Sequence, residues 1–190
     1  MTDALLPTSF VAYRPILQFL GRVYRLETES GALLLEVRMK LFRLREELVG
    51  FGDAARTDAR LTIKARSVFD FGATYDVTDA HTGERVGAWR RKGLESMFRD
   101  TWVLLDRSDQ QVGQLEEDSM ALALFRRLLF NLLPQRFTCT VGGRPAGFIQ
   151  QRFNLFRLHY EVRLDGAAVD PRLAQAIAVL LLAIEGRQQS

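Results

Sequence analysis

The C-terminal segment, residues 170–185, constrains the fold most because it is almost wholly apolar. Every residue in 176–184 is apolar, and polar side chains occur only near the ends, at Arg172, Gln175 and Glu185. Asp170 followed by Pro171 is a typical helix start, an N-cap and then a first-turn proline. A helix that is apolar all round either spans a membrane or is enclosed by protein. About fifteen residues reach roughly 22 Å, short of the ~30 Å hydrocarbon core, so we expect an enclosed helix.

Two stretches alternate apolar and polar residues with the period typical of a half-buried strand. In residues 35–41 the apolar side holds Leu35, Val37, Met39 and Leu41, and the polar side holds Glu36, Arg38 and Lys40. The parity changes at Phe42, which indicates a bulge or a sharp bend. The second stretch has a basic outer face that consists of Arg60, Thr62, Lys64 and Arg66.

An imperfect repeat of strand, turn and strand follows. Its three copies span residues 75–89, 102–115 and 137–149, and each return strand opens with an apolar residue and a glycine: Val86-Gly87, Val112-Gly113 and Ala146-Gly147. Connecting runs at 66–72, 92–98 and 152–157 each start with a basic residue and lead to an aromatic one. The pattern predicts a long antiparallel meander of hairpins.

Residues 119–133 interrupt the meander and predict a second helix that connects two β halves, with Ser119 as its N-cap and Pro134 after its end. Arg126 and Arg127 lie among its apolar residues. This helix is either amphipathic and interface-seeking or packed across one mouth of the β structure.

Many hairpins leave sheet edges, and a closed barrel removes them. Because an eight-stranded barrel is filled by its own side chains, a barrel that holds a helix needs more strands. We therefore predict a mainly β (β+α) fold, a closed antiparallel barrel of about twelve strands that encloses the C-terminal helix. The 190 residues fit one domain, with residues 1–20 as a lead-in and 170–185 as the central helix.

Cysteine usage and the N-terminus indicate a compartment. One cysteine, Cys139, cannot form a disulfide within the chain and supplies too few ligands for zinc. The N-terminus lacks the basic and apolar regions of a secretory signal. We expect a cytoplasmic protein, either free or peripheral at a membrane.

No constellation of residues indicates an enzyme. The two histidines, His81 and His159, do not form a recognisable group with a nucleophile and a carboxylate. The acidic residues 116–118 are more typical of a solvated turn than of a metal site. Gly142-Gly143 lacks the following helix that a phosphate-binding loop needs. We expect no catalytic residue, no metal and no cofactor.

Basic residues remain as candidate sites. The net charge is +3 with a pI of about 9.3, and of 26 basic residues all but Lys40, Lys64 and Lys92 are arginines. Arginine binds phosphate and carboxylate bidentately, although a G+C-rich genome would produce the same bias. The candidate anion-binding residues form three clusters: Arg60, Lys64 and Arg66; Arg90, Arg91 and Lys92; Arg126 and Arg127. Scattered arginines that only confer solubility are the alternative.

The chain resembles the LURP-one-related family of the tubby C-terminal-like superfamily, which also contains the phospholipid scramblases. The resemblance covers about residues 21–186 and rests on Tyr75-Asp76-Val77-Thr78-Asp79 with Gly83, the unit 92–113, Arg152-Phe153-Asn154-Leu155-Phe156 with Tyr160, and the apolar helix 173–185. It implies a twelve-stranded barrel around a central helix. Superfamily members are variously linked to phosphoinositides, lipid movement, transcription or defence, so the resemblance implies a fold more than an activity.

Together these patterns favour a non-enzymatic binding module that contacts anionic phospholipid or a phosphorylated ligand through surface arginines. The alternative is a scaffold or regulatory protein that docks partners on the 119–133 helix. A nucleic-acid-associated role ranks third, because the charge is modest and basic and aromatic residues do not interleave on one face. The sequence does not specify an oligomeric state.

Overall fold

The computed structural model describes residues 7–15, 22–39, 47–66, 73–92, 100–118, 134–154 and 156–185. These residues form one α-helix and twelve β-strands. The elements are β1 (Ser9–Pro15), β2 (Arg22–Glu27), β3 (Leu33–Met39), β4 (Leu48–Phe51), β5 (Ala59–Ala65), β6 (Thr74–Asp79), β7 (Arg85–Arg91), β8 (Thr101–Leu105), β9 (Gln111–Glu117), β10 (Arg136–Val141), β11 (Arg144–Arg152), β12 (Arg157–Leu164) and α2 (Pro171–Glu185).

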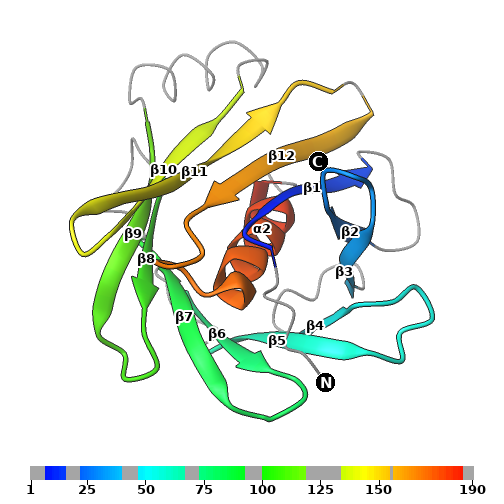
Figure 1. Cartoon of the computed structure of the whole chain (residues 1–190), viewed down its shortest axis with the longest axis horizontal. Helices are drawn as coiled ribbons and strands as arrows, with labels where there is room; N and C mark the ends of the chain where they lie inside the picture. The colour runs from blue at the N-terminus through cyan, green and yellow to red at the C-terminus, as the bar shows by residue number, and fades with distance from the viewer. Residues whose placement is uncertain are drawn as a thin grey trace.

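The strands form a closed antiparallel barrel in which every strand pairs with its neighbours in the sequence (Figure 1). β1 closes the ring by pairing with both β2 and β12. The prediction of a mainly β fold, with a closed barrel of about twelve strands and a C-terminal helix, is confirmed. The region expected to be a lead-in contains β1, whose Phe10 and Ala12 lie in the core.

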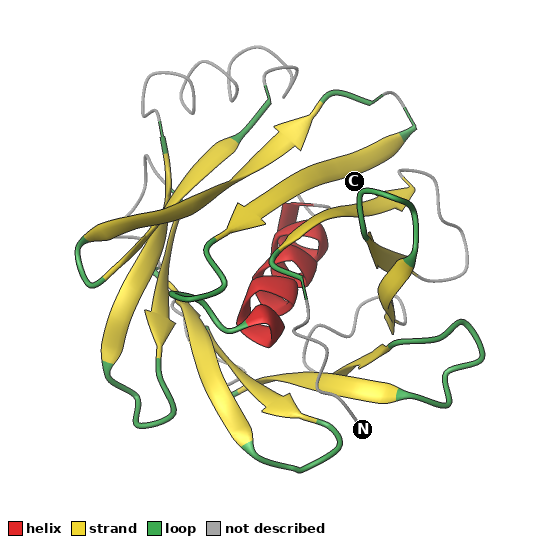
Figure 2. Cartoon of the chain, in the orientation of Figure 1, coloured by secondary structure: helices red, strands yellow, loops and turns green. Residues whose placement is uncertain are grey.

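The predicted repeat corresponds to the hairpins β6–β7, β8–β9 and β10–β11 (Figure 2). In each hairpin the register shifts by a β-bulge next to the repeated glycine. A Cβ atom on Gly87, Gly113 or Gly147 would lie 2.5, 2.4 or 2.1 Å from the carbonyl oxygen of Leu105, Thr140 or Arg163, respectively, in the next strand pair. The glycine of each copy therefore allows successive hairpins to approach closely.

Helix α2 lies against the inner face of several strands. It contacts β1, β2, β6, β7 and β12, and every side chain in residues 173–184 is buried. Its start is as predicted, because the Asp170 carboxylate accepts a hydrogen bond from the Arg172 amide at 2.9 Å. In Figure 1 the helix (red) is seen in the middle of the ring of strands.

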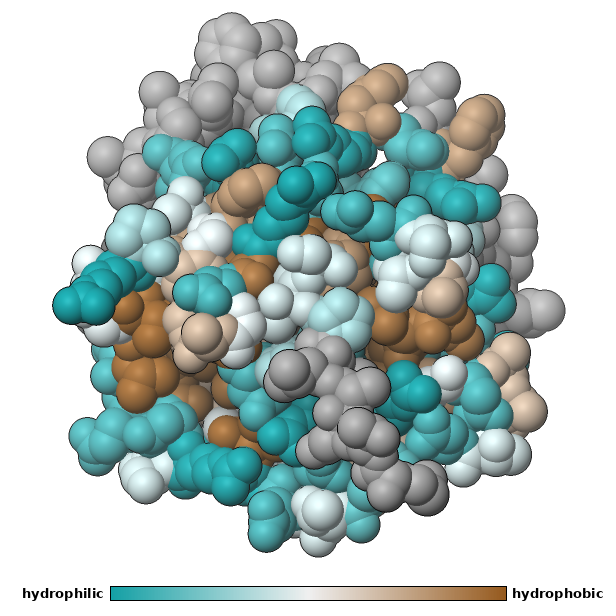
Figure 3. Space-filling view, viewed as in Figure 1, coloured by the Kyte–Doolittle hydropathy of each residue, from teal (hydrophilic) through white to brown (hydrophobic). Residues whose placement is uncertain are grey.

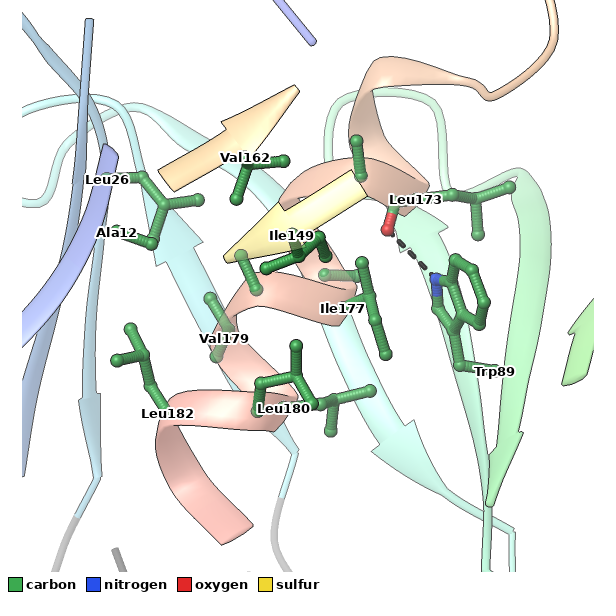
Figure 4. Close-up of a cluster of buried hydrophobic side chains, with 14 of the residues drawn as sticks. Ala12, Leu26, Trp89, Ile149, Val162, Leu173, Ile177, Val179, Leu180 and Leu182 are labelled. Carbon is green, nitrogen blue, oxygen red and sulfur yellow. Dashed lines mark hydrogen bonds between the residues drawn. The ribbon is translucent and has the colours of Figure 1, made fainter. Parts of the chain in front are cut away.

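A buried hydrogen bond connects the helix to strand β7 of the barrel. The Trp89 indole Nε1 donates to the Leu173 carbonyl oxygen at 2.9 Å (Figure 4). Further along, Ile177 lies on the Trp89 side of the helix, whereas Val179 and Leu182 point toward the opposite side. The helix therefore buries side chains in several directions, which explains the lack of a polar face in its sequence.

The alternation in β3 is confirmed for the core residues but not for Glu36. Leu35, Val37 and Met39 are buried in the core, yet the Glu36 side chain on the opposite face is also fully buried. Its carboxylate accepts hydrogen bonds from the Nε atoms of Arg25 and Arg38, at 3.0 and 2.8 Å. A buried charge needs such partners, so this outer face is not simply solvated.

Because the strands run in a meander, the turns at 28–32, 52–58, 80–84, 106–110 and 142–143 lie at one end of the barrel, called here the turn end. The N-terminus of α2 lies there too, since Arg172 donates to Asp79 at the end of β6 at 2.6 Å. The predicted helix 119–133 and the parity change at Phe42 fall outside the described residues.

Candidate anion-binding site

The strand register gathers basic residues at the end of the barrel opposite the turn end. β5, β7 and β11 finish there, and β6, β10 and β12 begin there. We call it the basic end, because it carries Arg66, Arg90, Arg91, Lys92, Arg136, Arg152 and Arg157. Residues from three separate hairpins are thus brought to one end of the molecule.

Lys64, Arg66 and Arg90 share the outer face of β5, β6 and β7 near this end. Lys64 lies opposite Asp76, and Arg90 lies opposite Thr74 on the same central strand. Lys64 and Arg90 are exposed, and neither has a carboxylate partner within the described ranges. These two side chains are therefore available to an external anion.

Arg66, in contrast, belongs to an ion-pair network with Arg85, Asp76 and Asp109. The Nε atoms of Arg66 and Arg85 both donate to the Asp76 carboxylate at 2.8 Å, and both guanidinium groups also donate to Asp109. Partial burial opposes ionisation of Asp76, but the two arginines outweigh it and lower its pKa below 3.8. They also lower the pKa of Asp109. Arg66 is largely neutralised within the molecule.

Arg60 is not part of the basic end. It lies at the turn end, where its Nε atom donates to Asp58 at 2.8 Å and its Nη1 atom to the Leu34 carbonyl oxygen at 3.2 Å. His81 Nε2 lies 3.2 Å from the same Asp58 carboxylate. The sequence pattern grouped Arg60 with Lys64 because both face outward on β5, but the length of the strand separates them.

Arg90, Arg91 and Lys92 do not share one face either. Arg91 has the parity of the buried Trp89, and its Nη2 atom donates to Asp100 at 2.8 Å. Alternation along β7 turns Arg90 to the outer face instead. Of the candidate residues described, Lys64 and Arg90 are the pair that combines exposure with the absence of a carboxylate partner. Arg126 and Arg127 lie outside the described residues.

Sequence reasoning missed Arg136, Arg152 and Arg157 as site residues. Arg136 lies beside Asp118 at 3.1 Å and Arg152 beside Glu161, whereas Arg157 stacks on Tyr13 with its guanidinium carbon 4.9 Å from the ring centre. The sequence did contain a signal for a shared basic end, because the connecting runs start with Arg66, Lys92 and Arg152. Alternate connections of an antiparallel barrel lie at the same end, so these basic starts must converge.

Candidate metal ligands and the single cysteine bear on metal binding and catalysis within the described part of the chain. No cluster of three or more His, Cys, Asp or Glu residues there could hold a metal ion. Cys139 is buried in the core, which raises the pKa of its thiol to about 11. Burial and the nearby Arg157 lower the pKa of His159. The Cys139 thiol therefore stays protonated near neutral pH and is not poised as a nucleophile.

The described surface is mostly hydrophilic in the view of Figure 3, with smaller hydrophobic areas between the polar residues. None of the helices formed by the described residues has the length and apolar character needed to cross a membrane. Comparisons with known proteins find no matching family model, curated protein or solved structure. The site is therefore interpreted from its own geometry.

Proposed function

We propose that this chain is a non-enzymatic binding module whose basic end contacts anionic phospholipid or another phosphorylated ligand. The observation that carries the proposal is the pair Lys64 and Arg90, exposed on one outer face without a carboxylate partner among the described residues. Their strands are separated only by β6. Lys64 lies opposite Asp76 and Arg90 opposite Thr74, so the two backbones are also offset by two residues and lie roughly 12 Å apart. Each side chain can reach a separate phosphate group.

The rest of the basic end supports this proposal. Arg157 is a third exposed cation, and among the described residues it contacts the Tyr13 ring and no carboxylate. Near an anionic surface each basic residue contributes about 1 kcal/mol of binding free energy. Three such residues at one end provide an orientation as well as an affinity, whereas at the turn end the exposed Arg107 and Arg163 lie beside Glu84 and Glu161.

We also propose that the barrel encloses α2, so that the helix fills its interior and any ligand binds on the outside. The complete burial of side chains 173–184 supports this view. Assignment to the LURP-one-related family is part of the same proposal, because that resemblance implies a twelve-stranded barrel around a C-terminal helix. A cytoplasmic protein that is peripheral at a membrane would be consistent with both the enclosed helix and the family assignment.

Co-sedimentation with vesicles tests the site through two matched double variants. Lys64→Gln/Arg90→Gln removes two charges from the basic end, while Arg56→Gln/Arg144→Gln removes two exposed charges from the turn end. With phosphatidylserine vesicles we expect the first variant to bind roughly tenfold to thirtyfold more weakly than the wild type. The second variant should bind nearly as well as the wild type.

Equal losses in both double variants would mean that only the net charge matters, and the proposed site would be wrong. Binding of a soluble phosphorylated compound such as inositol hexakisphosphate, without binding to vesicles, would assign the same residues to a free ligand. Arg126→Ala/Arg127→Ala, measured alongside, tests whether residues 119–133 contribute separately.

A further inference from the structure

The turn between β11 and β12 exposes two phenylalanine side chains at the basic end. Phe153 is 65% exposed and Phe156 is 77% exposed, and within the described ranges they are the large hydrophobic side chains that face solvent. Leu155, between them in the sequence, lies outside the described residues. Two exposed aromatic rings on one turn form an apolar tip on an otherwise basic end, the kind of feature that marks a contact surface.

The tip is held in shape by its own polar groups. The Asn154 side-chain oxygen accepts hydrogen bonds from the amides of Phe156 and Arg157, at 3.0 and 3.1 Å. On one side Arg152 Nε donates to Glu161 on β12 at 2.8 Å. On the other side Arg157 stacks on Tyr13 of β1. A turn fixed before binding loses little conformational entropy when its rings become buried.

The charges around the tip favour a membrane surface over a purely apolar protein partner. Arginines flank the two rings on both sides, and Arg157 has no carboxylate partner within the described residues. Apolar rings bordered by arginines match the bilayer interface, where aromatic groups enter below the headgroups and cations remain among the phosphates. A purely hydrophobic protein partner would leave the Arg157 guanidinium without a counterion, whereas Arg152 keeps its ion pair with Glu161.

We propose that the β11–β12 turn inserts Phe153 and Phe156 into the interfacial zone of an anionic bilayer, with Arg157 at the headgroups. This inference rests on the proposed function and deepens it, because it orients the basic end toward the membrane. Lys64 and Arg90 supply long-range attraction, while the rings supply a contribution that salt does not screen.

A tryptophan placed on the tip reports insertion directly. In the full chain carrying Phe156→Trp, emission should shift to the blue with phosphatidylserine vesicles, and brominated phospholipids should quench it. Both native tryptophans, Trp89 and Trp102, are buried and form a constant background. Arg144→Trp, at the exposed first residue of β11 at the turn end, is the matched control and should not be quenched. Vesicle binding without quenching of the Phe156→Trp variant would overturn the inference.

A truncation of both rings gives an independent result. Phe153→Ala/Phe156→Ala should weaken binding to the same vesicles about tenfold, and the loss should persist at salt concentrations that screen charge. If the wild type binds but this variant binds equally well, the insertion is wrong while the proposed function stands. If the wild type does not bind these vesicles, the insertion fails together with the membrane form of the proposed function, and binding of inositol hexakisphosphate alone would assign the basic end to a free ligand. A dimer in light scattering that disappears in the variant would instead assign the tip to self-association and overturn the insertion.

Discussion

At the scale of single residues, Gly147 shows how a missing side chain permits two strand pairs to meet. Its backbone has a φ of 113°, and a Cβ atom would lie 2.1 Å from the Arg163 carbonyl oxygen. We expect Gly147→Ala to lower the free energy of unfolding by about 3 kcal/mol or more, since backbone atoms must move. Urea unfolding followed by tryptophan fluorescence measures this. Gly142→Ala is the control, because it also has a positive φ but nothing lies within 4 Å of its Cβ position. A comparable loss in both variants would contradict the steric explanation.

Gln175 presents the opposite case, a polar side chain on an apolar helix. Its amide nitrogen and oxygen are both buried and make no hydrogen bond to the described residues. Because unpaired buried amide groups destabilise a fold by about 1–3 kcal/mol, Gln175→Met should raise the free energy of unfolding by about 1 kcal/mol. The increase is measured by urea unfolding. A decrease would show that the amide has a partner such as a buried water molecule.

At the scale of elements, the helix α2 organises the core, and its burial can be tested. Leu180 is fully buried, so Leu180→Asp places an unpaired charge in the hydrophobic core, which is expected to reduce stability by several kcal/mol from a typical total of about 5–15. We expect this variant to be unfolded or insoluble by circular dichroism and gel filtration. Gln111→Asp, at an exposed position of β9, should remain folded. A folded Leu180→Asp variant would contradict a buried helix.

Elements were the part of the structure that the sequence predicted best. The N-cap at Asp170, the apolar run and the three hairpins depend on local patterns, which can be recognised within a few consecutive residues. Burial of Glu36 was missed, because it depends on Arg25 and Arg38 meeting one carboxylate. Such contacts arise from strand pairing, which alternation within one strand does not specify.

The difference between local sequence patterns and strand pairing also explains how much of the candidate site could be predicted. Lys64 and Arg90 were recognisable as basic residues, but whether a carboxylate of the described residues pairs with them depends on how the strands pair. Arg66 and Arg91 look equivalent to them in sequence, yet Asp76 and Asp100 neutralise them in the fold. The periodicity of β5 also grouped Arg60 with Lys64, although only Lys64 lies near the basic end.

At the scale of the whole molecule, ion pairs couple stability to pH. Arginine partners lower the pKa values of Asp76, Asp109 and Glu161, so the unfolded chain binds protons at a higher pH than the folded one. Stability is therefore fully present above about pH 5 and should fall as the pH drops through 4 and below. Urea unfolding over a pH series measures this, and Asp76→Asn should flatten the curve. A stability that rises on acidification would contradict the ion-pair account.

The central claim is that the basic end docks the whole molecule on anionic membranes. The most direct measurement is the partition of the wild-type chain between buffer and vesicles with or without phosphatidylserine, over a range of salt concentrations. We expect binding to the anionic vesicles that weakens as salt increases, and little binding to phosphatidylcholine alone. Equal partition into both kinds of vesicle, or no partition into either, would contradict it.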